Sequence, residues 1–188
     1  MNIEELKKIN CVIGIDPGSN GGITIWRKGS LAKAVKMPKT LEELQAYLEY
    51  YKDIATPLVF LEKMSVRFSD MDNKGKIFRI QKLMENYANL KATITLSGLP
   101  YVLVHPMKWQ CGLKLRKIAK GVKEEKSERK KRFRDAAQKL YPEIKATLWN
   151  ADATLIMQYG RYILESDPNW VVSNIPSSVS RLFFANES

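Results

Sequence analysis

The stretch CVIGIDPGSNGG, residues 11–22, decides how the rest of the chain is interpreted. It begins with an apolar run typical of a buried strand, and that run ends on the carboxylate Asp16. The residues that follow are rich in glycine and other turn formers, which predicts a tight turn directly after the carboxylate. An isolated ionised carboxylate at the edge of a core is strongly unfavourable unless a charge or a hydrogen-bond donor pairs with it. Asp16 is therefore expected to have a specific partner.

Two further carboxylates stand in comparable positions. Glu62 closes the apolar run at residues 58–61, and Asp152 opens an amphipathic helix on the side that carries its apolar stripe. Three carboxylates at the ends of core elements suggest one shared partner, for which a divalent cation is the natural candidate. The alternative is that each carboxylate caps its own element or pairs with a nearby lysine or arginine.

The composition of the chain restricts its partners. Its 188 residues are enough for one substantial domain. It has 31 Lys and Arg residues against 20 Asp and Glu residues, a formal charge of +11, which favours a polyanionic partner such as DNA, RNA or an anionic membrane surface. No apolar run approaches the roughly 20 residues of a membrane span, and no secretory signal pattern starts the chain. Two distant cysteines and a single histidine argue against disulfides and Cys/His zinc sites, so we expect a cytoplasmic protein with reduced thiols.

Hydrophobic periodicity and turn signals predict an α/β chain. The strands are expected at residues 11–16, 23–26, 31–37, 58–61 and 101–104. The helices are expected at residues 41–51, at 77–98, after 127 and from about 150. Three antiparallel strands, then helix, strand, helix and strand, then further helices, is an α/β layout with a mixed sheet. We expect one domain over residues 1–165 and an irregular Ser/Pro-rich tail over residues 166–188.

Four segments carry a resemblance to a known family. They read GIDPGSNGG at residues 14–22, FLEKM at 60–64, VHPMKW at 104–109 and ADATLIMQYGR at 151–161. They resemble, in the same order along the chain, the motifs of RuvC-type Holliday junction resolvases of the ribonuclease H-like superfamily. The resemblance is strongest to the form of these motifs in phage members of the family. The resemblance implies a ribonuclease H-like mixed five-stranded sheet flanked by helices. It also implies a Mg²⁺-dependent endonuclease, with Mn²⁺ able to substitute, that resolves branched DNA such as four-way junctions as a homodimer in a bacterial or phage-infected cytoplasm.

The same resemblance implies roles for the three carboxylates. Asp16 would bridge two metal ions, while Glu62 and Asp152 would each complete one side of a two-metal site for phosphodiester hydrolysis. The family usually has a fourth acidic or histidine ligand about three residues before the last aspartate. Here that position is Trp149 and its neighbour is Asn150. Asn150 either ligates a metal through its amide oxygen or caps the helix that carries Asp152.

A basic segment at residues 108–134 concentrates the positive charge, with 12 Lys and Arg residues and three Glu residues. Charge of this density is typical of a surface for backbone phosphates, the alternative being an ordinary solvated face. The residues predicted to bind nucleic acid are Lys114, Lys117, Arg129, Lys130, Lys131, Arg132 and Arg134. By resemblance, Lys114 and Lys117 could approach the scissile phosphate.

Two aromatic side chains outside these groups have alternative roles. Phe68, in the polar loop after Glu62, resembles the aromatic residue that RuvC-type enzymes insert at the centre of a junction, where it would stack on a base. It could equally fold back onto the core. His105 is interpreted as a hydrogen-bonded structural residue, with metal ligation as the alternative.

The sequence leaves several functions in competition. A related nuclease could act on RNA or another structured nucleic acid, and the missing fourth acidic ligand allows a non-catalytic nucleic-acid-binding relative. A phosphotransferase of the sugar-kinase or actin type also uses a strand followed by Asp-x-Gly. Such enzymes need two copies of the fold, and 188 residues contain one.

Overall fold

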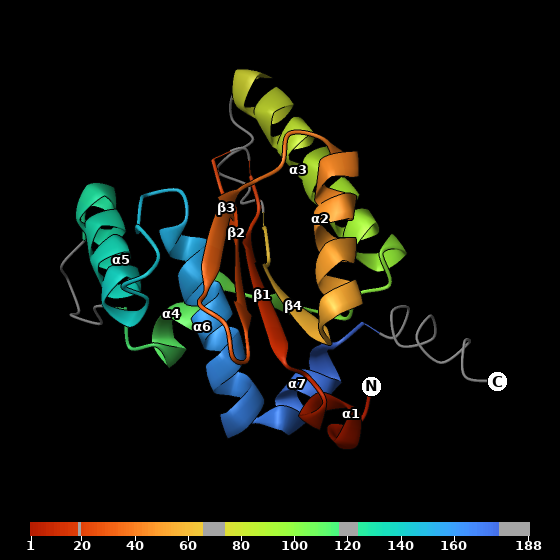
Figure 1. Ribbon diagram of the computed structural model, residues 1–188. Helices are drawn as coiled ribbons and strands as arrows, with labels where there is room; N and C mark the ends of the chain where they lie inside the picture. Colours follow the sequence, from red (N-terminus) through yellow and green to blue (C-terminus); the bar gives the residue numbers. More distant parts are fainter. Residues whose placement is uncertain (19, 66–73, 117–123, 177–188) are drawn as a thin grey trace.

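A mixed five-stranded sheet forms the centre of the protein in a computed structural model, which describes residues 1–18, 20–65, 74–116 and 124–176 (Figure 1). The strands are β1 (Cys11–Asp16), β2 (Gly22–Arg27), β3 (Lys33–Lys36), β4 (Pro57–Glu62) and β5 (Tyr101–Val104). Their order across the sheet is β3-β2-β1-β4-β5. Pairing is antiparallel from β3 to β1 and parallel from β1 to β5. The mixed five-stranded sheet of the predicted α/β fold is therefore confirmed.

Helices cover both faces of the sheet (Figure 1). They are α1 (Ile3–Lys7), α2 (Leu41–Ile54), α3 (Lys74–Leu96), α4 (Pro106–Gly112), α5 (Lys126–Leu140), α6 (Ala151–Ser166) and α7 (Pro168–Asn174). Helices α2 and α3 pack on one face, and α6 covers the other with α4, α5 and α7 around it. None of these helices, within the residues described, is long and apolar enough to cross a membrane.

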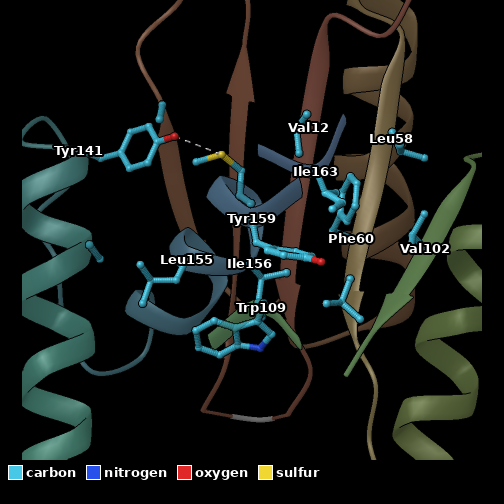
Figure 2. Close-up of a cluster of buried hydrophobic side chains, with 14 of the residues drawn as sticks. Val12, Leu58, Phe60, Val102, Trp109, Tyr141, Leu155, Ile156, Tyr159 and Ile163 are labelled. Carbon is cyan, nitrogen blue, oxygen red and sulfur yellow. Dashed lines mark hydrogen bonds between the residues drawn. The ribbon is translucent and has the colours of Figure 1, made fainter. Parts of the chain in front are cut away.

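Strand β1 supplies side chains to both layers of the core because successive residues of a strand point to opposite faces. Cys11, Ile13 and Ile15 belong to the core beneath α2 and α3. Val12 belongs to the core beneath α6. Figure 2 shows that second cluster, in which side chains of α6 meet those of the strands and of Trp109.

Gly14 lets α6 lie directly on β1. A Cβ atom at this position would lie 2.4 Å from the carbonyl oxygen of Ala153 and 2.4 Å from the backbone nitrogen of Met157. Both are backbone atoms that cannot move aside without shifting the helix. The absence of a side chain at Gly14 therefore fixes how close the first turns of α6 come to the end of β1.

The prediction of an irregular tail from residue 166 is wrong for the part that the structure describes. Helix α6 continues to Ser166, and α7 follows at once because Pro168 suits a first helical position and Asp167 accepts a hydrogen bond from the backbone N–H of Trp170. Val171 of α7 is fully buried, and α7 packs against α1, α6 and β5. Composition alone did not reveal a helix of seven residues. Residues 177–188 lie outside the described part of the chain.

Candidate active site

The carboxyl ends of β1 and β4 bring two of the predicted residues to the same edge of the sheet. The strands are parallel neighbours in which Ile15 pairs with Leu61, so Asp16 and Glu62 follow at matching positions. Each carboxylate is the last residue of its strand. This edge is where side chains from parallel strands converge in α/β folds.

Asp152 reaches the same edge from the first turn of α6. The close packing at Gly14 places this turn against β1, and a polar contact fixes it to β2. The hydroxyl of Thr154 donates a hydrogen bond to the carbonyl of Asn150 over 2.8 Å and lies 3.0 Å from the hydroxyl of Thr24. Thr24 and Thr154 are both completely buried, so this pair anchors the start of the helix within the core.

The three carboxyl groups lie close enough for their charges to act on one another. Burial raises the pKa of Asp16 to about 8, and the charges of Asp152 and then Glu62 add to that increase. Burial also raises the pKa of Glu62 to about 7, with a smaller contribution from Asp152. The pKa of Asp152 is raised by burial as well. Three half-buried carboxyl groups that repel one another form a site that a cation would stabilise.

Lys130 of α5 supplies a positive charge to this group. Its ammonium nitrogen lies 3.7 Å from Oδ2 of Asp152, and its charge lowers the pKa values of Asp16, Glu62 and Asp152. Lys130 shares a helical face with Phe133 and Ala137, both of which are buried against α6. The packing of α5 therefore directs Lys130 toward the carboxylates.

Trp109 of α4 holds the Glu62 carboxylate. Its indole N–H donates a hydrogen bond of 2.8 Å to Oε2 of Glu62, and this bond lowers the pKa of Glu62. The ring is 1 % exposed and packs edge-on against Phe133, with the ring centroids 5.2 Å apart. The motif at residues 104–109 ends on Trp109, and the sequence predicts a core or interface position for it but not this bond, although a buried indole N–H usually requires an acceptor. His105 is confirmed as a structural residue, because its Nδ1 accepts the Met107 backbone N–H and caps α4.

The donor chemistry of the site suits a hard divalent cation, since carboxylate oxygens are the ligands that Mg²⁺ and Mn²⁺ take in proteins. The arrangement is open, however. Over the described ranges, no three or more His, Cys, Asp and Glu side chains converge closely enough to enclose a metal ion as they stand. Asp16, Glu62 and Asp152 thus fit a metal by their chemistry, and binding would require their side chains to draw together.

The side chain of Asn150 does not cap the helix that follows it. The residue occupies the N-cap position of α6, yet its side chain makes no capping bond. Instead its Oδ1 accepts the backbone N–H of Thr147 over 2.7 Å, and its Nδ2 donates to the carbonyl of Lys145 over 3.1 Å. The side chain is 2 % exposed and stabilises the turn before the helix, so the predicted capping bond is wrong.

The structure separates the basic residues that the sequence analysis grouped together. Lys131 is exposed, whereas Arg132 is held by Glu124 through a 2.5 Å ion pair and lies over the ring of Phe133. Arg134 pairs with Asp135, and Arg129 is exposed with a charge that lowers the pKa of Asp152. Lys114 is exposed just after α4. Phe68 and Lys117 lie outside the described residues.

No protein-family model matches this chain, and no curated protein sequence matches it. Solved structures resemble it in fold. Thermus thermophilus RuvC, in complex with a Holliday junction substrate, aligns with a TM-score of 0.53 at 15% sequence identity, over 84% of this chain and 96% of that chain. A second structure of Thermus thermophilus RuvC aligns with a TM-score of 0.48 at 14% identity, over 88% of this chain and 98% of that chain. The first of these likenesses shows a shared RuvC-like, ribonuclease H-like fold.

The raised pKa values predict how the metal-free protein responds to pH. A carboxyl group whose pKa rises from 3.8 to about 8 on folding contributes stability that is complete below the unfolded value. That contribution is lost as pH rises through the folded value. In EDTA, the unfolding free energy of the wild type should therefore fall relative to that of Asp16→Asn between about pH 5 and about pH 9. Denaturant unfolding at several pH values measures the difference, and a difference that does not change with pH would contradict the assignment.

A second prediction concerns the bond from Trp109 to Glu62. Trp109→Phe keeps an aromatic ring but removes the donor, which should cost about 1.5–3 kcal/mol as the loss of a hydrogen bond to a charged group. In a Glu62→Ala background the same substitution should cost much less, since the acceptor is already absent. Chemical unfolding of the four proteins at about pH 9, where the Glu62 carboxyl with its pKa of about 7 is ionised, gives the coupling energy. Equal costs in the two backgrounds would mean that the indole stabilises the core by packing alone.

Proposed function

We propose that this chain is a divalent-metal-dependent endodeoxyribonuclease that cuts branched DNA such as four-way junctions. The observation that carries the proposal is the meeting of Asp16, Glu62 and Asp152 at one sheet edge, beside the basic helix α5. Half-buried acidic groups next to a basic surface match the needs of phosphodiester cleavage, in which a cation and a polyanion must occupy adjacent places. The shared fold with RuvC adds support, since that protein was solved with a Holliday junction substrate.

The carboxylates would hold Mg²⁺, or Mn²⁺ in its place. When bound, the ion would supply a Lewis acid that activates water and stabilises the charge of the reacting phosphate. The chain's own residues prepare the place for it. Trp109 keeps Glu62 oriented, the contact at Gly14 keeps Asp152 beside Asp16, and Lys130 offsets part of the negative charge before an ion arrives.

Exposed basic residues would hold the DNA backbone. Arg129, whose charge acts on Asp152, and Lys131 are exposed residues of α5, and Lys114 follows α4. Such contacts bind phosphates without reading bases, so selectivity for a branched substrate would depend on shape. Symmetric cutting of a four-way junction needs two active sites, which a two-fold homodimer of this chain in a bacterial cytoplasm would supply.

A second candidate, a non-catalytic DNA-binding protein, is favoured by one observation. Lys130 pairs with Asp152, and the three carboxylates do not enclose an ion as they stand. In that case the ammonium group would serve as the permanent partner of the acids. The basic surface of α5 would keep its role in binding.

Nicking of a synthetic four-way junction in Mg²⁺, compared with linear duplex and RNA/DNA hybrid, tests the proposal. The wild type should cut the junction in preference to both, and Asp16→Asn should abolish cutting while it leaves junction binding intact. Glu62→Gln and Asp152→Asn should behave alike, and combined losses should be far from additive because the three groups act as a unit. Asp53→Asn makes the same change at an exposed position on α2 and serves as the control.

Two outcomes would contradict the nuclease. Activity of Asp16→Asn within about tenfold of the wild type, ~1.4 kcal/mol in barrier, would remove Asp16 from the site. Junction binding without cutting at any Mg²⁺ concentration would favour the binding protein.

The contact between Lys130 and Asp152 leads to a prediction about how tightly the metal-free site binds a divalent cation. Lys130→Ala removes a cation that an incoming metal must displace, so Mn²⁺ affinity in the absence of DNA should rise by up to about fivefold, or about 1 kcal/mol for a partly exposed pair. Lys131→Ala removes the same charge one residue away, on the exposed side of the helix, and should leave the affinity unchanged. Calorimetric titration with Mn²⁺ measures both. Equal changes of Mn²⁺ affinity in the two variants would contradict a specific role for Lys130, because net charge alone would then explain the effect.

A further inference from the structure

A cavity of about 410 Å³ opens beside the carboxylates, on the face of the sheet that α2 and α3 cover. Pro17 and Gly18, which directly follow Asp16, form part of its wall, and so does Met64, two residues after Glu62. The start of α2 and the middle of α3 complete the wall. Figure 1 shows the start of α2 at the same end of the sheet as the carboxyl ends of β1 and β4. The cavity therefore adjoins the proposed cleavage site.

The lining of the cavity combines apolar walls with a few polar groups. Leu44, Leu83 and Leu90 supply apolar surface. Asn86 and Asn89 of α3 are exposed, and their side-chain amides hydrogen-bond no residue in the described ranges. The lining that the structure describes contains one cation, Lys39, and no carboxylate. A neutral ligand with polar edges would therefore meet hydrogen-bonding groups and no carboxylate in this lining.

Tyr87 adds a buried polar group to this wall. Its side chain is 5 % exposed, and its hydroxyl has no hydrogen-bond partner among the described residues. Burial raises the pKa of Tyr87 more than the backbone of Met64 lowers it, so the hydroxyl keeps its proton and is available as a donor. A buried hydroxyl without a partner is costly, which points to a ligand that would satisfy it.

These features match a nucleobase more closely than a sugar, a metal or a peptide. A base is flat and apolar on its faces and carries donors and acceptors on its edges, and proteins that hold an unpaired base stack its faces on apolar side chains and bind its edge with polar groups. Asparagine amides pair well with such edges, those of adenine in particular. The volume lies within the range of small-ligand pockets, and one base would fill only part of it.

We infer that this cavity receives one unpaired base of the strand being cut, next to the phosphate at Asp16 and Glu62. The inference rests on the proposed function. A base leaves its stack at low cost at a branch point and at higher cost inside a duplex. The cavity would thus favour branched DNA over linear duplex, and the amides of Asn86 and Asn89 would set a preference for the base that occupies it.

Removal of single bases from a four-way junction tests the inference without cleavage. Junctions that carry one abasic nucleotide, scanned through the positions around the branch point, are bound to the full chain in EDTA, and fluorescence anisotropy gives the affinity. For the wild type, one position should weaken binding by about tenfold, which lies within the range for the loss of one stacked base. In Leu83→Trp, which fills the cavity, that abasic position should have no further effect.

Two amide variants keep the test decisive if Leu83→Trp does not fold. Asn86→Ala combined with Asn89→Ala changes only exposed side chains and should reduce the abasic effect and flatten any preference among the four bases. Gln81→Ala removes an exposed amide from the same helix outside the cavity and should retain the full wild-type pattern.

The outcomes separate this inference from the proposed function. The junction could be bound and cut while the cavity variants leave the effect of every abasic position unchanged. That result would overturn the base site and leave the nuclease proposal standing. Loss of self-association in Leu83→Trp without such coupling would assign the cavity to a second copy of the chain and would also overturn it. Absence of both junction binding and cutting would overturn both proposals.

Discussion

Direct contact between α6 and the backbone of β1 is the constraint on which the site depends. At Gly14 there is no room for a Cβ atom, because the backbone of α6 occupies the space that it would need. The same closeness recurs further along α6 at Gly160, where a Cβ atom would lie 2.5 Å from the ring of Phe60. The helix therefore lies flat on the sheet, and its first turn brings Asp152 to the end of β1. Without this approach the three carboxylates would not face one another.

The negative charge gathered in this way is offset by neighbouring elements. Lys130 approaches from α5, and the indole of Trp109 approaches from α4. The two elements are joined through the packing of Trp109 on Phe133, so the basic helix and the Glu62 carboxylate belong to one packed unit. A change in the position of α5 would reach the carboxylates through this contact. Helix α7 extends the same layer, since Trp170 lies under the ammonium group of Lys108 on α4 at 3.7 Å from the ring centroid.

Much of the fold and the acidic residues could be predicted from the sequence because both depend on local patterns. Strands β1, β4 and β5 are short apolar runs, and Asp16 and Glu62 end two of them, so the pattern alone placed these carboxylates at strand ends. The short helices α1, α4 and α7 were missed because five to seven residues are too few for a periodic signal.

The contacts that organise the site could not be predicted, because they join residues far apart in the chain. The bond from Trp109 crosses 47 positions to reach Glu62. Three consecutive basic residues also look alike in the sequence, so spacing could not show which of them faces the acids. In the structure Lys130 faces the acids, Lys131 faces solvent and Arg132 is held by Glu124. Asn150 was misjudged for a related reason, since its side chain binds the turn before the helix instead of the helix itself.

A crystal structure of the protein grown with Mn²⁺ would test the central claim most directly, because the anomalous signal locates the ion without reference to activity. We expect at least one Mn²⁺ ion bound by carboxylate oxygens of Asp16 and of Glu62 or Asp152, with the Lys130 ammonium group moved away from Asp152. A structure at saturating Mn²⁺ that has no ion at this edge and retains the contact between Lys130 and Asp152 would contradict the account. The acidic group would then be a structural ion-pair cluster, and the metal-dependent site would not exist.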